Sequence, residues 1–316
     1  MEAVLKKSGP HLAGPAAVGA RSKLSIKVIQ TGTGNPPVRL ISSPQNIGTL
    51  RRRLGVIFCR ERTGPHPINA YLIEHPEGLI VVDTGDTARK SDRGYMPRLN
   101  PGFRRVLDIR VAPDEEIGPQ LNAMGIRSKD VRLVVLTHLH HDHTGGLHHF
   151  PHNRILANAE SLRFAKRMRG LAGAVPRNWP IWFDPEPLVF SGPAVSPFAR
   201  CAPLTQDGSI FAVETPGHMT GHVCVVARSE DLTYVLAGDL TYRQHLLMDD
   251  AVCGATENPA VSLASQRAIK EFAQHEATVL LPAHDPEAAR RLADGLTIYP
   301  RPRPFAPRPG SNEITQ

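Results

Sequence analysis

The stretch Leu136 to Gly146 reads LTHLHHDHTGG, and it follows directly on the apolar run VRLVVL, which ends at Leu136. Four histidines and one aspartate fill the six positions 138–143, and Leu139 is the only other residue there. The apolar run is typical of a buried strand. Because a rigid scaffold often presents its functional side chains where strands end, we expect this stretch to lie at the functional site.

The spacing of these side chains favours a metal site. His138 and His140 are two positions apart, so a turning loop can direct both at one ion, while Asp142 and His143 can reach a second ion. Imidazole and carboxylate are ligands for zinc and related metals, and crowding them without a cation would be costly. The alternative is a solvated histidine-rich loop. An H-x-H-x-D-H pattern arises by chance on the order of once in several hundred such chains.

Three residues farther along the chain could complete this site, because each stands at the end of a predicted strand. His218 follows the turn Thr215-Pro216-Gly217, Asp239 closes the run LTYVLAGD, and His284 closes the run TVLLPAH. Taken singly, each could be a polar residue that caps a strand. Three such coincidences of metal-ligating residue types favour a single shared site.

The remaining chain alternates strand-like and helical runs. Strands are predicted over 54–59, 69–75, 78–83, 131–137, 209–215, 222–228, 232–239 and 278–284. Helices are predicted over 114–126, 259–276 and 286–295, the last ending at Gly295. Clusters of strands followed by helices, twice over, predict an α/β protein in which two sheets pack together with helices on their outer faces.

Composition narrows the functional classes. The 316 residues, 41% of them hydrophobic, suffice for one large domain or two ordinary ones. The net charge is +7, but no nucleic-acid-binding motif accompanies it, and the basic run 51–53 is predicted to be a solvated strand edge. Four scattered cysteines without a CxxC pair predict reduced thiols and a cytoplasmic location. No segment approaches the roughly 18 apolar residues of a membrane span.

The chain is predicted to divide into three parts. Residues 1–23 are expected to form a flexible extension, residues 24–300 a catalytic domain, and residues 301–316 a proline-rich tail.

The motifs over most of residues 24–295 resemble the metallo-β-lactamase superfamily: VVDTG with Asp83, the H-x-H-x-D-H block, the TPGH turn, the GD strand end and LPAHD. The resemblance implies an αββα sandwich of two mixed sheets flanked by helices, with a dinuclear site at one edge. It implies that Asp83 supports the ligands from beneath and that Asp239 bridges both ions. It assigns His138, His140 and His218 to the first ion and Asp142, His143 and His284 to the second.

Two segments, 67–85 and GDLTY (238–242), resemble the N-acyl-homoserine lactonase branch, in which a tyrosine three residues after the bridging aspartate touches the substrate carbonyl. Here that position is Tyr242. The resemblance implies that a hydroxide bridging two divalent ions opens a lactone ring, most readily that of an N-acyl-homoserine lactone (quorum quenching). Tyr242 would stabilise the oxyanion, and Asp142 would pass a proton to the leaving oxygen. Zinc is expected, with iron, cobalt and manganese as alternatives.

Two other functions stay open: a different dinuclear hydrolase, acting on a phosphotriester, an aryl ester or another lactone, and a non-catalytic binding or redox protein on the same fold. The partner expected is a small-molecule lactone, with no nucleic acid and no membrane. A homodimer is left open.

The irregular segment 170–185 is predicted to be a lid over the acyl chain of the substrate. It carries Trp179, Trp182 and Phe183, and Met219 is a further candidate pocket residue. The alternative is that these aromatic side chains pin the segment to the core. His222 and His245 are expected in the pocket wall or at the surface.

Overall fold

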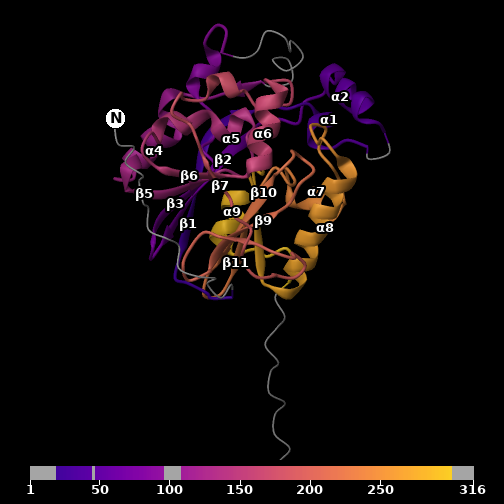
Figure 1. Cartoon of the computed structure of the whole chain (residues 1–316). Coiled ribbons are helices and arrows are strands. Elements are labelled where there is room, and N and C mark those ends of the chain that lie inside the picture. The colour runs from indigo at the N-terminus through magenta and orange to yellow at the C-terminus, as the bar shows by residue number, and fades with distance from the viewer. Residues whose placement is uncertain (1–18, 45–46, 96–107, 301–316) are drawn as a thin grey trace, which may run out of the picture.

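Two mixed β-sheets form the centre of the computed structural model, which describes residues 19–44, 47–95 and 108–300 (Figure 1). The first sheet has the order β4-β1-β2-β3-β5-β6-β7 and the second the order β12-β11-β10-β9-β8. The strands of the first sheet are β1 (Ser25–Gly34), β2 (His66–His75), β3 (Gly78–Val82), β4 (Ile109–Arg110), β5 (Val131–Val135), β6 (Arg154–Ala157) and β7 (Glu186–Pro187). Those of the second are β8 (Ala202–Pro203), β9 (Ile210–Glu214), β10 (Val223–Arg228), β11 (Thr233–Gly238) and β12 (Thr278–Pro282).

Helices and short 3₁₀ turns connect and cover these strands. The α-helices are α1 (Val38–Ile41), α2 (Thr49–Phe58), α4 (Ile117–Ala123), α5 (His141–Thr144), α6 (Ala159–Met168), α7 (Gln244–Met248), α8 (Pro259–His275) and α9 (Ala288–Asp294). The 3₁₀ turns are η1 (Ala88–Ser91), η2 (Pro113–Glu115), η3 (Ser128–Asp130), η4 (Gly145–His149) and η5 (Pro176–Asn178). None of these described helices is long and apolar enough to cross a bilayer.

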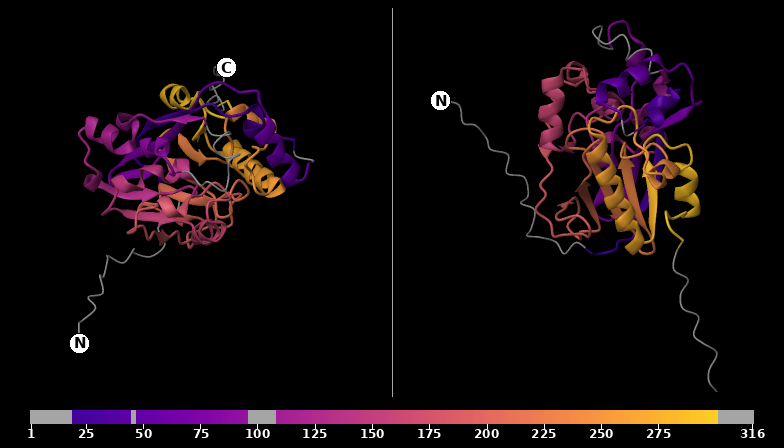
Figure 2. Two further views of the ribbon diagram at one scale, coloured as in Figure 1. Left: turned by 90° about the horizontal axis from the view of Figure 1, so that it is seen from above. Right: turned by 90° about the vertical axis from the view of Figure 1, so that its right-hand side faces the viewer.

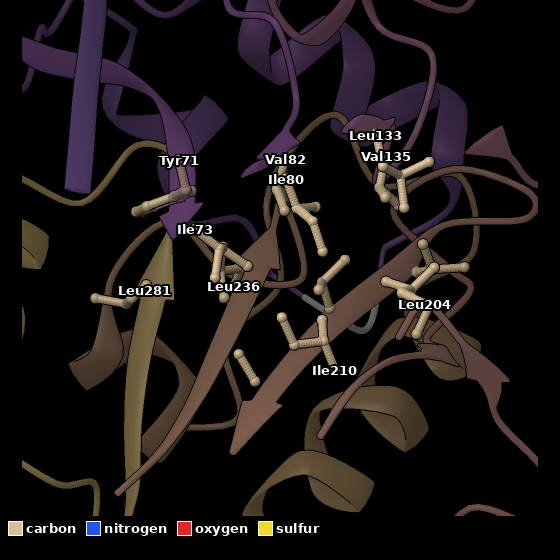
Figure 3. Packing of buried hydrophobic residues seen from close by; sticks show 14 of the residues in the cluster. Tyr71, Ile73, Ile80, Val82, Leu133, Val135, Leu204, Ile210, Leu236 and Leu281 are labelled. Atoms are coloured by element: carbon tan, nitrogen blue, oxygen red, sulfur yellow. The ribbon is translucent and has the colours of Figure 1, made fainter. Parts of the chain in front are cut away.

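Side-chain alternation along the strands builds the layers. In β3, Ile80 and Val82 point into the cluster between the two sheets, whereas Val81 points to the outer cluster. In β11, Leu236 joins the central cluster, and Val235 lies on the opposite face. Figure 3 shows the central cluster, in which side chains of both sheets interdigitate. Since each sheet is apolar on both faces, both outer faces need helices.

Helices cover these outer faces. Ile117 and Leu121 of α4 pack on the first sheet, and Ile269 and Phe272 of α8 pack on the second. In Figure 1, α4 and α8 lie on opposite sides of the strands, and the view from above in Figure 2 shows the same separation. The predicted αββα sandwich of two mixed sheets is therefore confirmed. The last helix, α9, ends at Gly295, as predicted, and Gly295 adopts the left-handed conformation.

The strand predicted over 54–59 is wrong, because residues 54–58 belong to α2 and Cys59 caps this helix. The helix buries Arg52 and Val56, four positions apart, while Leu54 and Phe58 remain exposed to solvent. Periodicity cannot separate a short apolar run of this kind from a strand. The basic run 51–53 is not a strand edge either: the Arg52 side chain is buried and donates to the carbonyl oxygen of Thr256.

Several elements were not predicted, among them β1 and α6. Beside β1, Ser22 pairs with the second sheet, since its amide donates to the carbonyl oxygen of Arg228 at 3.1 Å. Arg21 and Ser22 of the predicted extension are therefore bonded to the end of β10 and to Ser229, which follows it. Residues 1–18 and the predicted tail 301–316 lie outside the described residues.

Candidate metal centre

One edge of the sandwich gathers all seven predicted metal ligands. Four ligands, His138, His140, Asp142 and His143, follow β5 of the first sheet. The other three follow strands of the second sheet: His218 after β9, Asp239 after β11 and His284 after β12. Because β9, β11 and β12 run in the same direction, their carboxyl ends meet at this edge. The amide of Val223 donates to the carbonyl oxygen of Thr137 at 2.9 Å and ties the two sheets together there.

The first ligand group is His138, His140, His218 and Asp239. Nε2 of His138 and Nε2 of His218 each lie 3.0 Å from Nδ1 of His140. Oδ2 of Asp239 lies 3.1 Å from Nε2 of His218 and 3.9 Å from Nε2 of His138. Four donor atoms thus converge on one point within a buried site.

Within this group, the electrostatics of His138 and His140 suit metal ligation. Burial and the neighbouring imidazoles hold the pKa of His138 and that of His140 well below the usual range, so both rings are neutral. The outward Nδ1 of His138 lies 3.1 Å from Oγ1 of Thr137. A neutral ring held from behind presents its free nitrogen to an ion.

The second ligand group is Asp142, His143 and His284. Nε2 of His284 lies 3.5 Å from Oδ2 of Asp142, and Nε2 of His143 lies 4.0 Å from Oδ1 of Asp142. Nδ1 of His284 lies 3.0 Å from the carbonyl oxygen of Pro67, which orients the ring. A carboxylate and two imidazoles again form a set of ligands typical of zinc.

Asp239 joins the two groups through its two oxygens. Oδ2 faces His218, whereas Oδ1 lies 3.3 Å from Nε2 of His143 and 3.2 Å from Nε2 of His284. Oδ1 of Asp239 and Nε2 of His143 are buried and make no hydrogen bond within the described part of the chain. Such orphaned atoms are costly unless something bonds them. The residues present therefore fit two cations, with Asp239 between them.

Asp83 supports the second group from below. Its Oδ1 accepts from the amide of Thr137 at 2.8 Å, and its Oδ2 accepts from Oγ1 of Thr137 at 2.7 Å and from Nδ1 of His143 at 2.8 Å. The backbone of Asp83 has φ +61°, which is unusual for a residue with a side chain. Strain of this kind is concentrated at functional sites, where the surrounding structure holds it.

Two buried residues contribute to the centre without having been predicted to do so. His222 lies neither in a pocket wall nor at the surface: it is fully buried, and its Nε2 accepts from the amide of Asp239 at 3.1 Å. Burial and His218 lower the pKa of His222 to about 3, which keeps that nitrogen an acceptor. Sγ of Cys253 lies 3.3 Å from Nδ1 of His218 and orients this ring. A histidine before a strand and a distant cysteine carry no sequence signal for these roles.

Tyr242 lies beside both ligand groups. Its ring centroid is 4.9 Å from that of His284 and 6.3 Å from that of His218, and the residue is buried. Burial, reinforced by Asp239, raises the pKa of the Tyr242 phenol well above its usual value. The hydroxyl therefore keeps its proton and can donate a hydrogen bond.

A pocket opens next to Asp142, Tyr242 and His284. The remaining lining residues are largely apolar and come from the end of β1, from α1 and from the starts of β2 and β4: Gly34, Asn35, Pro36, Leu40, Ile41, His66, Ile68, Asp108 and Ile109. The region 33–66, for which the sequence predicted no role, thus supplies much of this wall.

The predicted lid segment packs against the ligand loop. Trp179 and Phe183 join the outer core cluster of the first sheet, and Nε1 of Trp179 donates to Oγ1 of Thr144 at 3.3 Å. Trp182 is 38% exposed, and Met219 is fully buried in the same cluster as Phe183. None of these four side chains is among the described residues that line the pocket beside Tyr242. Their role toward a substrate stays a prediction.

The sequence signature of the Metallo-beta-lactamase superfamily matches residues 63–284, which is more than half of the chain. The chain belongs to the metallo-beta-lactamase superfamily. The matched range contains all seven predicted ligands of the two groups described above.

Similar proteins place this superfamily member among hydrolases. It is 26% identical to the N-acyl homoserine lactonase AttM of Agrobacterium fabrum over 263 residues, covering 80% of this chain and 95% of the relative. It is 28% identical to a probable metallo-hydrolase of Mycobacterium tuberculosis over 250 residues, 75% of each chain. By family and by these relatives, the protein is a metal-dependent hydrolase.

The fold also matches solved structures. One is an N-acyl homoserine lactone hydrolase with the product N-hexanoyl-L-homoserine bound at its catalytic metal centre, with a TM-score of 0.67 and 19% identity. The similarity covers 86% of this chain and 96% of that one. At this level of identity, the likeness supports the metallo-beta-lactamase fold.

Proposed function

We propose that this hydrolase opens a lactone ring, with N-acyl-homoserine lactones as its substrates, an activity known as quorum quenching. The observation that carries the proposal is the position of Tyr242. Its side chain packs between the two ligand groups and the apolar pocket, and its hydroxyl is protonated. The similarity to the lactonase AttM supports the same substrate class.

In this proposal, His138, His140 and His218 would hold one divalent ion, Asp142, His143 and His284 would hold a second, and Asp239 would contribute to both sites. Zinc suits the nitrogen and oxygen donors, and iron, cobalt or manganese would be accepted by the same set. When bound, two such ions supply Lewis acidity that polarises an ester carbonyl and makes water a nucleophile at neutral pH.

The chain's own groups then act on the substrate. Tyr242 donates its hydroxyl proton in a hydrogen bond to the carbonyl oxygen of the lactone, where negative charge develops during attack. Because the raised pKa keeps this hydroxyl protonated, it acts as a fixed donor and gives up no proton. A substrate seated in the pocket would displace water around this hydroxyl, which would strengthen the hydrogen bond.

Asp142 is the candidate proton carrier. Its side chain is 13% exposed, whereas that of Asp239 is 2% exposed, so Asp142 is the more accessible carboxylate to a molecule in the pocket. A carboxylate in this position can accept a proton from the attacking water and deliver it to the ring oxygen as the ester bond breaks.

The pocket wall fits the rest of an acylated lactone. Leu40, Ile41, Ile68 and Ile109 offer an apolar surface to an alkyl chain. Oδ1 of Asn35 is buried and makes no hydrogen bond to other described residues. Asn35 also lines this pocket, and a turn of its side chain would let that oxygen accept from the amide N–H that distinguishes an N-acyl-homoserine lactone from a simple lactone.

A substrate panel tests the proposal. Metal-loaded protein would be offered N-acyl-homoserine lactones with chains of four to twelve carbons, an unsubstituted lactone, an aryl ester and a phosphotriester. We expect acid release to be fastest with the acylated lactones, and substitution Ile41→Trp, which fills the pocket, to raise KM most for the longest chains. Faster cleavage of the phosphotriester or aryl ester would reject the substrate assignment and leave the metal centre intact.

A further inference from the structure

A second cluster of ligand-type side chains lies outside the metal centre, where the chain after the ligand loop meets the start of α4. Glu116 immediately precedes α4, and His148 and His149 end η4. Oε2 of Glu116 lies 3.0 Å from Nε2 of His148 and 2.7 Å from Nε2 of His149. Each of the three donor atoms lies within 4.8 Å of the other two. Two imidazoles therefore face one carboxylate oxygen.

The carboxylate is held in place from its other side. The Glu116 side chain is 8% exposed, and its Oε1 accepts from Oγ1 of Thr87 at 2.9 Å and from the amide of Ala88 at 2.8 Å. These two donors lower the pKa of Glu116 against the opposing effect of burial, together with His149 and His148. A charged oxygen, Oε2, is thus left pointing at the two histidines.

The two histidines are also fixed. The ring of His149 rests on the backbone of Gly118, where an added Cβ atom would lie 2.4 Å from Nδ1 of the ring. Nδ1 of His148 lies 3.1 Å from the carbonyl oxygen of Gly145. Metal-binding histidines are commonly oriented in this way, by a carbonyl oxygen behind the nitrogen that does not bind the ion.

The contact with Gly145 decides the proton position on His148. A carbonyl oxygen can only accept, so Nδ1 of His148 carries a proton. In the neutral ring, Nε2 then holds a lone pair, yet it faces the lone pairs of the Glu116 carboxylate at 3.0 Å. That contact is repulsive unless a cation lies there, either a second proton on His148 or a metal ion shared by the cluster.

We propose that Glu116, His148 and His149 bind a divalent metal ion of the zinc class, separate from the two ions of the metal centre. Two imidazoles and one carboxylate form a common zinc ligand set. Tetrahedral ligands at about 2.0 Å from zinc are about 3.3 Å apart, so each imidazole nitrogen needs to move away from Oε2 of Glu116 by only a few tenths of an ångström. The His148 side chain is 35% exposed, so solvent can supply the fourth ligand.

The surroundings restrict which ions could bind. His148 lines a pocket together with Arg89, Arg177 and Trp179, and the two guanidinium groups disfavour cations in general. A cation that bonds imidazole strongly can overcome this repulsion, whereas magnesium or calcium, which prefer oxygen ligands, cannot.

An ion in this cluster would brace the ligand loop. Glu116 is bonded to the start of η1, and His148 holds the carbonyl oxygen of Gly145, whose amide donates to the carbonyl oxygen of Gly85 at 2.8 Å. The ion would thus tie together the segments on either side of the loop that carries Asp142 and His143. This role is structural and does not depend on which substrate the enzyme cleaves.

Zinc counting tests the inference. Metal-free full-length protein would be titrated with Zn²⁺ against a chromophoric chelator, and bound zinc would be counted after gel filtration. We expect His149→Gln and Glu116→Gln each to bind one ion fewer than the wild type. His152→Gln is the matched control, because His152 is an exposed histidine three positions beyond His149 and outside the cluster; it should bind as many ions as the wild type.

The difference of one ion between wild type and variant is the readout, so the result does not depend on how many ions the metal centre holds or on lactone hydrolysis. Binding of the ion in the Glu116, His148 and His149 cluster should also raise the Tm of the wild type. Zinc should cause no such additional rise in His149→Gln or Glu116→Gln. Equal zinc counts and equal Tm shifts in the wild type and in folded variants would mean that the cluster holds only a proton, and would overturn the inference. Folding of each variant is checked by circular dichroism.

Discussion

Oδ2 of Asp83 lies 2.8 Å from Nδ1 of His143, and the Asp83 backbone reaches this position only by adopting a φ of +61°. The strained aspartate thus couples the end of β3 to a ligand of the second group. Substitution Asp83→Asn keeps a side chain that tolerates this backbone conformation but removes the charge behind His143.

We expect Asp83→Asn to weaken binding of the second ion about 10- to 100-fold, because outer partners of ligand histidines contribute that much to metal affinity. Metal retained at increasing chelator concentration measures the effect. Asp184→Asn, at an exposed aspartate, is the control. If Asp83→Asn retains its metal as tightly as the control, Asp83 does not support the site.

Tyr242→Phe should lower kcat for lactone hydrolysis by up to roughly 10²-fold and leave KM nearly unchanged, because the hydroxyl acts on charge that develops during attack. Steady-state kinetics on metal-loaded protein measure both constants. Tyr299→Phe is the control, since Tyr299 packs against the outer cluster of the second sheet. A rise in KM alone would assign Tyr242 to substrate binding.

Gly217→Ala should both destabilise the fold and weaken the first ligand group. The φ of Gly217 is +129°, and an added Cβ would lie 2.2 Å from the amide nitrogen of Ser262. We expect a loss of about 1–3 kcal/mol in the free energy of unfolding, with reduced metal binding through His218. Gly55→Ala in α2, where an added Cβ meets no atom within 4 Å, should instead be neutral or stabilising. Urea denaturation compares the two, and similar effects would contradict the account of this turn.

The lowered pKa of Asp207 predicts that the free energy of unfolding depends on pH. Its carboxylate accepts from the amide of Ser209 at 2.9 Å and lies 3.1 Å from Nε2 of His75. Burial opposes the charge, but these groups lower the pKa of Asp207 to about 2, below the value of about 3.9 in an unfolded chain. A depressed pKa stabilises the fold above the unfolded value, and this contribution is lost as the pH falls from about 4 towards about 2.

We therefore expect Asp207→Asn to cost about 1 kcal/mol at neutral pH, since the group is partly exposed and screened. The difference from the wild type should shrink below pH 4. Denaturation of metal-free protein over that range measures it, with the exposed Asp231→Asn as the control. A difference that grows on acidification would contradict the assignment.

Ligand residues that directly follow an apolar strand were predictable from sequence. His138, Asp239 and His284 each follow a run of buried residues, and that pattern survives in the fold because these strands are covered on both faces. The alternation in β1 is also typical of a strand, because Ile26 and Val28 pack against the central cluster while their neighbours face away from it.

Other features depended on contacts between distant parts of the chain. Arg52 in α2 bonds Thr256, and His222 bonds the backbone of Asp239, and neither pairing leaves a trace in local periodicity. The pocket wall shows the same limit: Leu40 and Ile41 reach Tyr242 only because α1 folds against the region that follows β11. Tertiary packing, not propensity, decides such elements.

The central claim is that this protein hydrolyses an acylated lactone and that its activity requires two metal ions, which Asp239 would help to hold. The most direct test measures acid release from N-acyl-homoserine lactones by protein of known metal content, before and after chelation, with Asp239→Asn beside the exposed control Asp249→Asn. We expect chelation to abolish turnover, added metal to restore it in the wild type and in Asp249→Asn, and Asp239→Asn to stay inactive. A metal-loaded wild type that leaves every lactone intact, or an Asp239→Asn variant that turns over at the wild-type rate, would contradict the claim.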